Sequence, residues 1–154
     1  MKLFKNILFV VENRDICTPA LERAISLAKN NHAKLTVIDV TPTITSGIGM
    51  PEGGPISSEL QNAMVSSHQQ LIADLIEPYL KKLKIETKVL VGVSFLEIIH
   101  EVLRNEHDLV IKVPEDPDWL DQLFGSNDMH LLRKCPCPVL LLKPQTTASF
   151  KNIL

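Results

Sequence analysis

The chain has 154 residues, of which 45% are hydrophobic and 22% charged, and its formal net charge is −2. This size and composition are typical of one soluble globular domain. The small net charge argues against a general attraction to nucleic acid or to an anionic membrane, and no apolar run reaches the length of a membrane span. Three cysteines, an odd number, favour a reducing compartment, so we expect a cytoplasmic protein.

Apolar periodicity predicts strands and helices in strict alternation along the chain. In chain order, the pattern predicts a strand at 7–11, a helix at 18–31, a strand at 35–40, a helix at 57–83, a strand at 86–91, a helix at 94–102, a strand at 109–113, a helix at 127–134 and a strand at 139–142. This alternation indicates an α/β protein with a five-stranded parallel doubly wound sheet and helices on both faces.

Capping residues and prolines set the expected helix ends. Thr18 precedes Pro19 and is expected to be the N-cap of the first helix, and Ser57 or Ser58 that of the second. Pro78 removes a backbone donor, so we expect the second helix to kink or break just before it. Ser94 with Glu97 fits a capping box at the third helix.

The stretch from Asp108 to Lys143 holds the most informative motif. An apolar strand is followed by an acidic segment, by Gly125-Ser126, by a short helix and by the apolar run Val139–Leu142, which suits a strand covered on both faces. A strand, a loop and a Gly-Ser turn before a helix can hold a phosphate on the backbone N–H groups at the helix N-terminus. A tight turn with an ordinary cap is the alternative.

The sequence FGSNDMHLLRKCPCPVLLLK at 124–143 resembles the C-terminal signature of the universal stress protein family. ILFVVE at 7–12, Gly92 and DLVI at 108–111 lie where that family has matching segments. The resemblance implies an adenine nucleotide alpha hydrolase-like fold. Many members of that family bind ATP through the motif G-x2-G-x9-G-[ST], which follows the fourth strand.

This chain departs from that glycine motif. Counting back from Gly125, the other two glycine positions hold Glu115 and Lys112. Side chains there block the close backbone approach that phosphates need. Within 112–128 one lysine faces five acidic residues, namely Glu115, Asp116, Asp118, Asp121 and Asp128. We therefore expect no ATP cofactor.

A degenerate nucleotide site is the alternative. The resemblance places it at Glu12, which follows the first strand, at Val40, and at Gly125 and Ser126. The chain would then be an ATP- or AMP-binding or weakly hydrolysing stress protein. Our leading hypothesis is instead a non-catalytic stress-response domain that acts through domain pairing. A phospho-acceptor receiver domain ranks last, because it needs clustered aspartates at strand ends.

No other pattern predicts catalysis or a metal. The five histidines lie far apart without metal-ligand spacing. Cys135 and Cys137 have C-x-C spacing with no second pair, which favours structural thiols. No catalytic Ser-His-Asp or Cys-His group can be assigned.

The last five residues repeat an earlier pentapeptide. FKNIL at 150–154 is identical to FKNIL at 4–8, the opening of the first strand. We therefore expect a universal stress protein domain over 1–144, with a linker and the start of a second, truncated copy over 145–154. This arrangement resembles tandem members of the family of the E type. The expected partner is that second domain, or another copy of this chain paired through the strand at 139–143.

Overall fold

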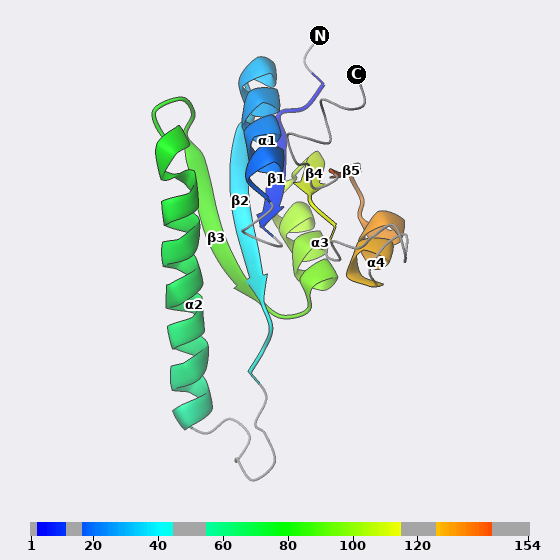
Figure 1. The fold of residues 1–154 in the computed structure, drawn as a ribbon. Coiled ribbons are helices and arrows are strands. Elements are labelled where there is room, and N and C mark those ends of the chain that lie inside the picture. The colour runs from blue at the N-terminus through cyan, green and yellow to red at the C-terminus, as the bar shows by residue number, and fades with distance from the viewer. Residues whose placement is uncertain (1–2, 12–16, 45–54, 115–125, 143–154) are drawn as a thin grey trace, which may run out of the picture.

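The computed structural model describes residues 3–11, 17–44, 55–114 and 126–142, with the side chains of 55–57 and 126 left out. Its elements are β1 (Asn6–Val11), α1 (Thr18–Asn31), β2 (Lys34–Thr41), α2 (Pro55–Ile76), the 3₁₀ turn η1 (Glu77–Tyr79), β3 (Ile85–Val91), α3 (Ser94–Asn105), β4 (Leu109–Lys112), α4 (Ser126–Lys134) and β5 (Val139–Leu141). The strands form one parallel sheet in the order β3-β2-β1-β4-β5 (Figure 1). The predicted five-stranded parallel α/β sheet is confirmed.

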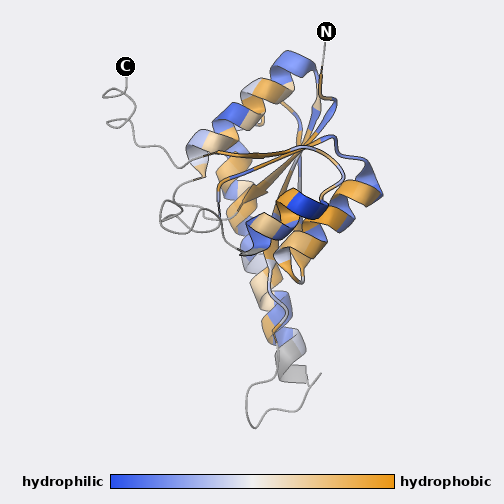
Figure 2. Cartoon of the chain, turned by 90° about the vertical axis from the view of Figure 1, so that its right-hand side faces the viewer, coloured by the Kyte–Doolittle hydropathy of each residue, from blue (hydrophilic) through white to orange (hydrophobic). Residues whose placement is uncertain are grey.

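The central strand β1 separates two apolar layers. Its continuous apolar run suits a position covered on both faces, and Phe9 lies between Val37 of β2 and Ile111 of β4. Alternate residues of β1 face opposite sides, so Ile7 and Phe9 pack with α1 and α2, whereas Leu8 and Val10 pack with α3 and α4. Figure 2 shows helices on both sides of the strands.

The predicted capping residues of three helices are wrong, although the helices predicted from 18 and from 94 begin at Thr18 and Ser94. Helix α1 includes Thr18, and the residue before it makes no side-chain capping bond. Helix α2 begins at Pro55, a residue suited to the first helical position because it has no N–H to satisfy there. The capping box at α3 does not form, because Val93 is the N-cap and Ser94 is already helical.

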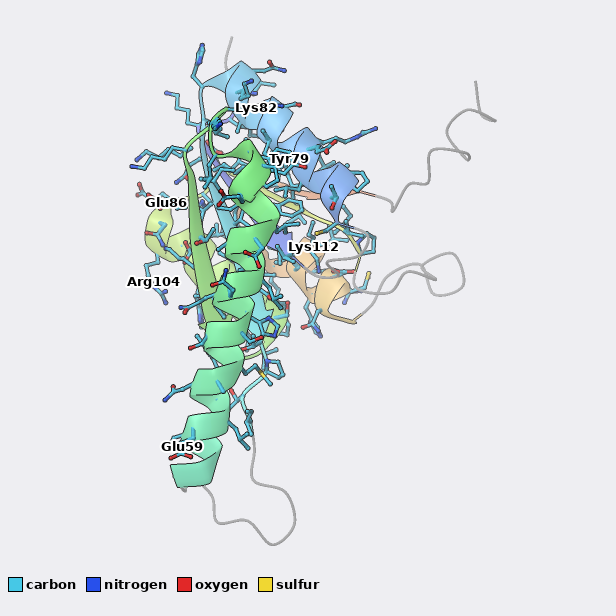
Figure 3. The ribbon with its side chains drawn as sticks, turned by 60° about the vertical axis from the view of Figure 1, so that its left-hand side comes forward. Glu59, Tyr79, Lys82, Glu86, Arg104 and Lys112 are labelled. Atoms are coloured by element: carbon cyan, nitrogen blue, oxygen red, sulfur yellow. The ribbon has the colours of Figure 1, made fainter. Side chains whose placement is uncertain are left out.

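Helix α2 is the longest of the described helices and ends where Pro78 was expected to end it. It stops at Ile76 and passes into η1, which contains Pro78. Its first turns extend beyond the sheet, with Glu59 near that end and Tyr79 past the other (Figures 1 and 3). Ile72 and Ile76 are its buried residues among the side chains described. No helix in the described ranges is long and apolar enough to cross a membrane.

Strand β5 lies at the edge of the sheet and is not covered on both faces as its apolar run suggested. Val139 and Leu141 are half-buried, and Leu140 is 42% exposed. Its hydrogen-bonded neighbour in the sheet is β4. An outermost strand has a neighbour on one side only, so an apolar sequence alone cannot bury it.

Candidate functional site

A cavity opens at the carboxyl edge of the sheet, where parallel α/β folds place ligands. Its volume is about 440 Å³. The lining residues come from the ends of β2 and β3 and from the starts of α3 and α4, and they are Val40, Pro42, Thr43, Gly92, Val93, Ser94 and Asn127. A larger hollow, of about 540 Å³, is lined by residues of α1 alone and brings no second element to a ligand.

Gly92 allows the chain to turn at the rim of this cavity. Its φ is +149°, a value that side-chain-bearing residues rarely adopt, and a Cβ there would come within 2.9 Å of the Glu97 side chain. The backbone N–H of Gly92 donates to the carbonyl of Thr41 at 2.9 Å, which joins the ends of β2 and β3. The turn therefore leads the chain from β3 to Val93 and Ser94, which line the cavity.

One hydroxyl group of the cavity has no partner within the described part of the chain, and it is Oγ of Ser94 at the start of α3. Oγ1 of Thr41 also lacks a partner there, but Thr41 does not line the cavity and shares the α2 face of β2 with Asp39. Buried hydroxyls normally form a hydrogen bond, so Ser94 could accept one from a ligand or from water. Another polar lining group, Oδ1 of Asn127, accepts from the backbone N–H of Phe95 at 3.4 Å.

An ion pair is buried between β4 and the first turn of α4. Nζ of Lys112 donates to Oδ1 of Asp128, and both residues are fully buried. Figure 3 shows Lys112 beside α4. The first turn of a helix attracts anions because its N–H groups and its dipole point there. In this protein that position already holds the carboxylate of Asp128, and Lys112 balances its charge.

On the other side of the sheet, a histidine and an aspartate join β2 to α2. The Nδ1–H of His68 donates to Oδ2 of Asp39 at 2.5 Å. Asp39 is 8% exposed, so this contact pairs a carboxylate that would otherwise lack water. The pair lies at the carboxyl half of β2 but on the α2 face, away from the cavity.

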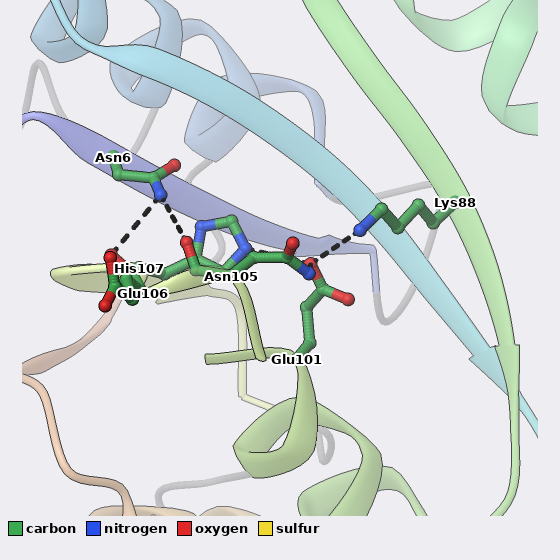
Figure 4. Close-up of polar contacts among 6 residues, drawn as sticks. All are labelled: Asn6, Lys88, Glu101, Asn105, Glu106 and His107. Atoms are coloured by element: carbon green, nitrogen blue, oxygen red, sulfur yellow. Dashed lines mark hydrogen bonds and ion pairs between the residues drawn. The ribbon is translucent and has the colours of Figure 1, made fainter. Parts of the chain in front are cut away.

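A third polar cluster lies near the amino ends of the strands (Figure 4). Oε2 of the fully buried Glu101 accepts from Nζ of Lys88 at 2.9 Å and from Nε2–H of His107 at 2.9 Å. Nδ2 of Asn105 donates to the same oxygen at 2.8 Å. Asn6 on β1 donates to the carbonyls of Asn105 and Glu106, at 2.8 and 3.3 Å, and so fastens the end of α3 to the sheet.

The charge of Glu101 depends on these partners. Burial raises the pKa of its carboxyl, but the hydrogen bonds and charges of His107 and Lys88 outweigh burial, so the pKa lies below its ordinary value. A polar hollow of about 240 Å³ adjoins the cluster. Because the cluster joins α3 to β3 and, through His107, to the segment between α3 and β4, we interpret it as a structural clamp.

The predicted site residues are placed only in part. Val40 lines the cavity. Glu12, Gly125 and the acidic residues at 115–121 lie outside the described residues, and Ser126 starts α4 without a described side chain. His130 is exposed and stacks on Phe95, with ring centroids 4.6 Å apart. Within the described ranges, no three metal-ligating side chains gather.

Sequence reasoning missed Glu101 and Asp39. A signal existed for Glu101, which lies on the apolar stripe of α3 between Ile98 and Val102, so its burial could have been inferred. Asp39 is the one acidic residue of β2 and lies between the apolar residues Ile38 and Val40. In both cases the partner is distant in sequence and could not be named.

Comparison with known proteins agrees with this fold. The model of the universal stress protein family matches residues 3–143. Universal stress protein E of Salmonella typhi is 32% identical over 152 residues, which cover 94% of this chain and 47% of that protein. The chain thus spans about half the length of the E-type relatives it matches.

Solved structures of the family share the architecture. The universal stress protein UspA of Lactobacillus plantarum superposes with a TM-score of 0.75 at 21% identity, over 91% of this chain and 98% of that one. The Archaeoglobus fulgidus universal stress protein in complex with dAMP has a TM-score of 0.60 at 15% identity, over 93% and 100% of the two chains. The fold is the adenine nucleotide alpha hydrolase-like fold expected from the sequence. From these matches and the parallel sheet, the chain belongs to the universal stress protein family.

Proposed function

We propose that this domain is a non-catalytic, cytoplasmic stress-response module that does not hold ATP and acts through pairing with another domain of its family. The buried ion pair of Lys112 and Asp128 is the observation that supports the lack of ATP binding. The segment between Gly92 and Gly125 also lacks the glycines of the usual ATP-binding motif.

The pair acts against phosphate binding in two ways. First, the Asp128 carboxylate lies in the first turn of α4, where a bound phosphate would use the same N–H groups and dipole. Second, the Lys112 ammonium is directed to that carboxylate, so the pair carries no net charge with which to attract a polyphosphate. A ligand phosphate would have to separate two buried charges, which costs several kcal/mol.

Support for pairing comes from the edge strand and from the length of the relatives. β5 has an apolar sequence, lies at the edge and leaves Leu140 42% exposed, which suits addition of a further strand. The E-type relatives are about twice as long as the matched region, so a second domain in the same chain is the natural partner. A second copy of this chain, paired through 139–143, is the other.

A second candidate function is binding of a nucleotide at the carboxyl edge of the sheet, with or without weak hydrolysis of that nucleotide. The cavity of about 440 Å³ and the unpartnered hydroxyl of Ser94 favour it, as does the dAMP complex of the Archaeoglobus relative. Glu12, Val40, Gly125 and Ser126 would contribute to that site. A nucleotide with few phosphates fits this cavity better than ATP, because its binding would depend less on the first turn of α4, where Asp128 lies.

Calorimetric titration separates the two candidates. Mg-ATP and dAMP are each titrated into the chain, and turnover of ATP is followed in parallel. We expect no heat that corresponds to a Kd below about 0.1 mM, or roughly −5.5 kcal/mol, for ATP. ATP binding tighter than this, or measurable turnover, would refute the non-catalytic proposal, whereas binding of dAMP alone would support the second candidate.

A further inference from the structure

Two of the three cysteines lie next to each other at the junction of α4 and β5. Cys135 follows the last residue of α4, and Cys137 lies two positions later. Their sulfur atoms are 3.8 Å apart, and both residues are half-buried. Spacing alone favoured inert thiols, but it could not show that the two side chains turn toward each other.

The backbone holds this junction on both sides. The N–H of Cys135 donates to the carbonyl of Leu131 at 2.9 Å, so the residue stays attached to the last turn of α4. The carbonyl of Pro138 accepts from the N–H of Val110 at 3.0 Å, which fastens the segment to β4. Pro136 fixes the φ between the two cysteines. The sulfur atoms are therefore kept as neighbours by the fold.

We propose that Cys135 and Cys137 form a redox-active dithiol that hydrogen peroxide oxidises to a disulfide within the chain. In the first step, the Cys135 thiolate attacks one peroxide oxygen. The O–O bond breaks, a sulfenic acid forms on Cys135, and the leaving hydroxide takes a proton to become water. In the second step, the Cys137 sulfur attacks the sulfenic sulfur and releases a second water. Two thiols and one peroxide thus give one disulfide and two waters.

The environment selects Cys135 as the attacking thiol. A hydrogen bond from the Cys137 thiol lowers the pKa of Cys135 to about 7, despite the opposing effect of burial. The pKa of Cys137 is raised, first of all by that same interaction with Cys135. At neutral pH a substantial fraction of Cys135 is therefore thiolate, the reactive form, while Cys137 keeps its proton. Cys17 is 1% exposed and provides an internal control.

The disulfide is expected to be readily reduced. The sulfur atoms must approach from 3.8 Å to about 2.05 Å, and a C-x-C link closes a small ring that contains Pro136 and is followed by Pro138. Strain of this kind raises the reduction potential, and strained disulfides are the labile ones. The site is thus suited to reversible sensing of an oxidant rather than to permanent stabilisation.

Intact mass after peroxide treatment tests the proposal. The reduced 154-residue chain is treated with equimolar hydrogen peroxide at neutral pH, and remaining thiols are alkylated after unfolding. Compared with the same chain alkylated without peroxide, the wild-type chain and Cys17→Ser should each carry two fewer alkyl additions and be lighter by a further two hydrogens, with the link mapped to Cys135 and Cys137. Cys135→Ser and Cys137→Ser should not show this loss. An unchanged wild-type mass, or disulfides only between chains, would overturn the proposal.

Two further measurements complete the test. One shows which cysteine reacts first with peroxide, and the other uses the unmodified chain and so does not depend on the folding of a variant. Dimedone should trap sulfenic acid on Cys135 in Cys137→Ser, and far less on Cys137 in Cys135→Ser; equal labelling would refute the assigned roles. In the unmodified chain, phenylarsine oxide, which chelates neighbouring thiols, should protect both cysteines from alkylation at one equivalent. Absence of protection would contradict the dithiol even if a variant failed to fold.

Discussion

Asp128 on α4 and Lys112 on β4, 16 positions apart in the chain, meet as a fully buried ion pair. Asp128→Asn removes one charge and leaves the lysine ammonium buried without it, so we expect the free energy of unfolding to fall by about 3–5 kcal/mol. Urea denaturation followed by circular dichroism measures the change. The double variant Lys112→Met/Asp128→Leu should recover most of it; a double variant as unstable as the single one would contradict this account.

The same pair predicts how charge affects phosphate binding. In Asp128→Asn the lysine no longer faces a carboxylate at the start of α4, so binding of inorganic phosphate should increase relative to the wild-type chain. Asp74→Asn, on the exposed face of α2, makes the same charge change far from α4 and should have no effect. Equal phosphate affinity of the wild-type chain and both variants would show that the ion pair does not govern this site.

Glu101 predicts a defined pH dependence of stability. Its pKa is lower in the folded protein than in the unfolded chain, so its contribution is fully present above the unfolded pKa, about 4.3, and is lost as the pH falls through the folded value. Glu101→Gln should therefore destabilise the protein by about 1–3 kcal/mol at neutral pH. The difference from the wild-type chain should shrink at pH values below about 4.

Exposed Glu106 provides the control for Glu101, since Glu106→Gln at the end of α3 changes the same charge without a buried carboxylate. Urea midpoints of the three proteins are compared across the pH range. A Glu101→Gln difference that stays constant or grows in acid would reverse the expected sign and rule out the lowered pKa.

Strand β5 predicts self-association of the isolated chain. Leu140 is 42% exposed on this edge strand, so Leu140→Lys should weaken edge-to-edge pairing and shift sedimentation toward the monomer. Leu132→Lys is the matched control, because Leu132 is 41% exposed but lies on α4. A wild-type chain that is monomeric at high concentration, or an equal effect of both substitutions, would count against pairing through β5.

The sequence was sufficient for the sheet and for most element positions. Apolar runs of strand length, separated by helical stripes, leave few arrangements other than a parallel doubly wound sheet. Pro78 ended a helix where its missing N–H required it. Helix caps were less predictable, because Ser94 resembles a cap in sequence but is the first helical residue, and Val93 is the N-cap of α3.

The polar pairs of the protein could not be predicted in the same way. Lys112 was recognisable as the one charged residue of its strand, yet nothing local indicates that its partner is Asp128 on a later helix. Glu101 gathers partners from β3, from its own helix and from the segment between α3 and β4, which only the fold brings together. Of the proposed nucleotide residues, Val40 is the one whose side chain the structure describes.

The two ends of the long helix α2 differ in local stability. Its 22 residues span about 33 Å, and the turns that reach past the sheet have mostly exposed side chains, whereas Ile72 and Ile76 are buried in the core. The apolar contacts that oppose opening are therefore concentrated near the C-terminal end. Amide hydrogen exchange should be fast around Glu59 and slow near Ile72, so the start of α2 can unwind while the sheet stays folded.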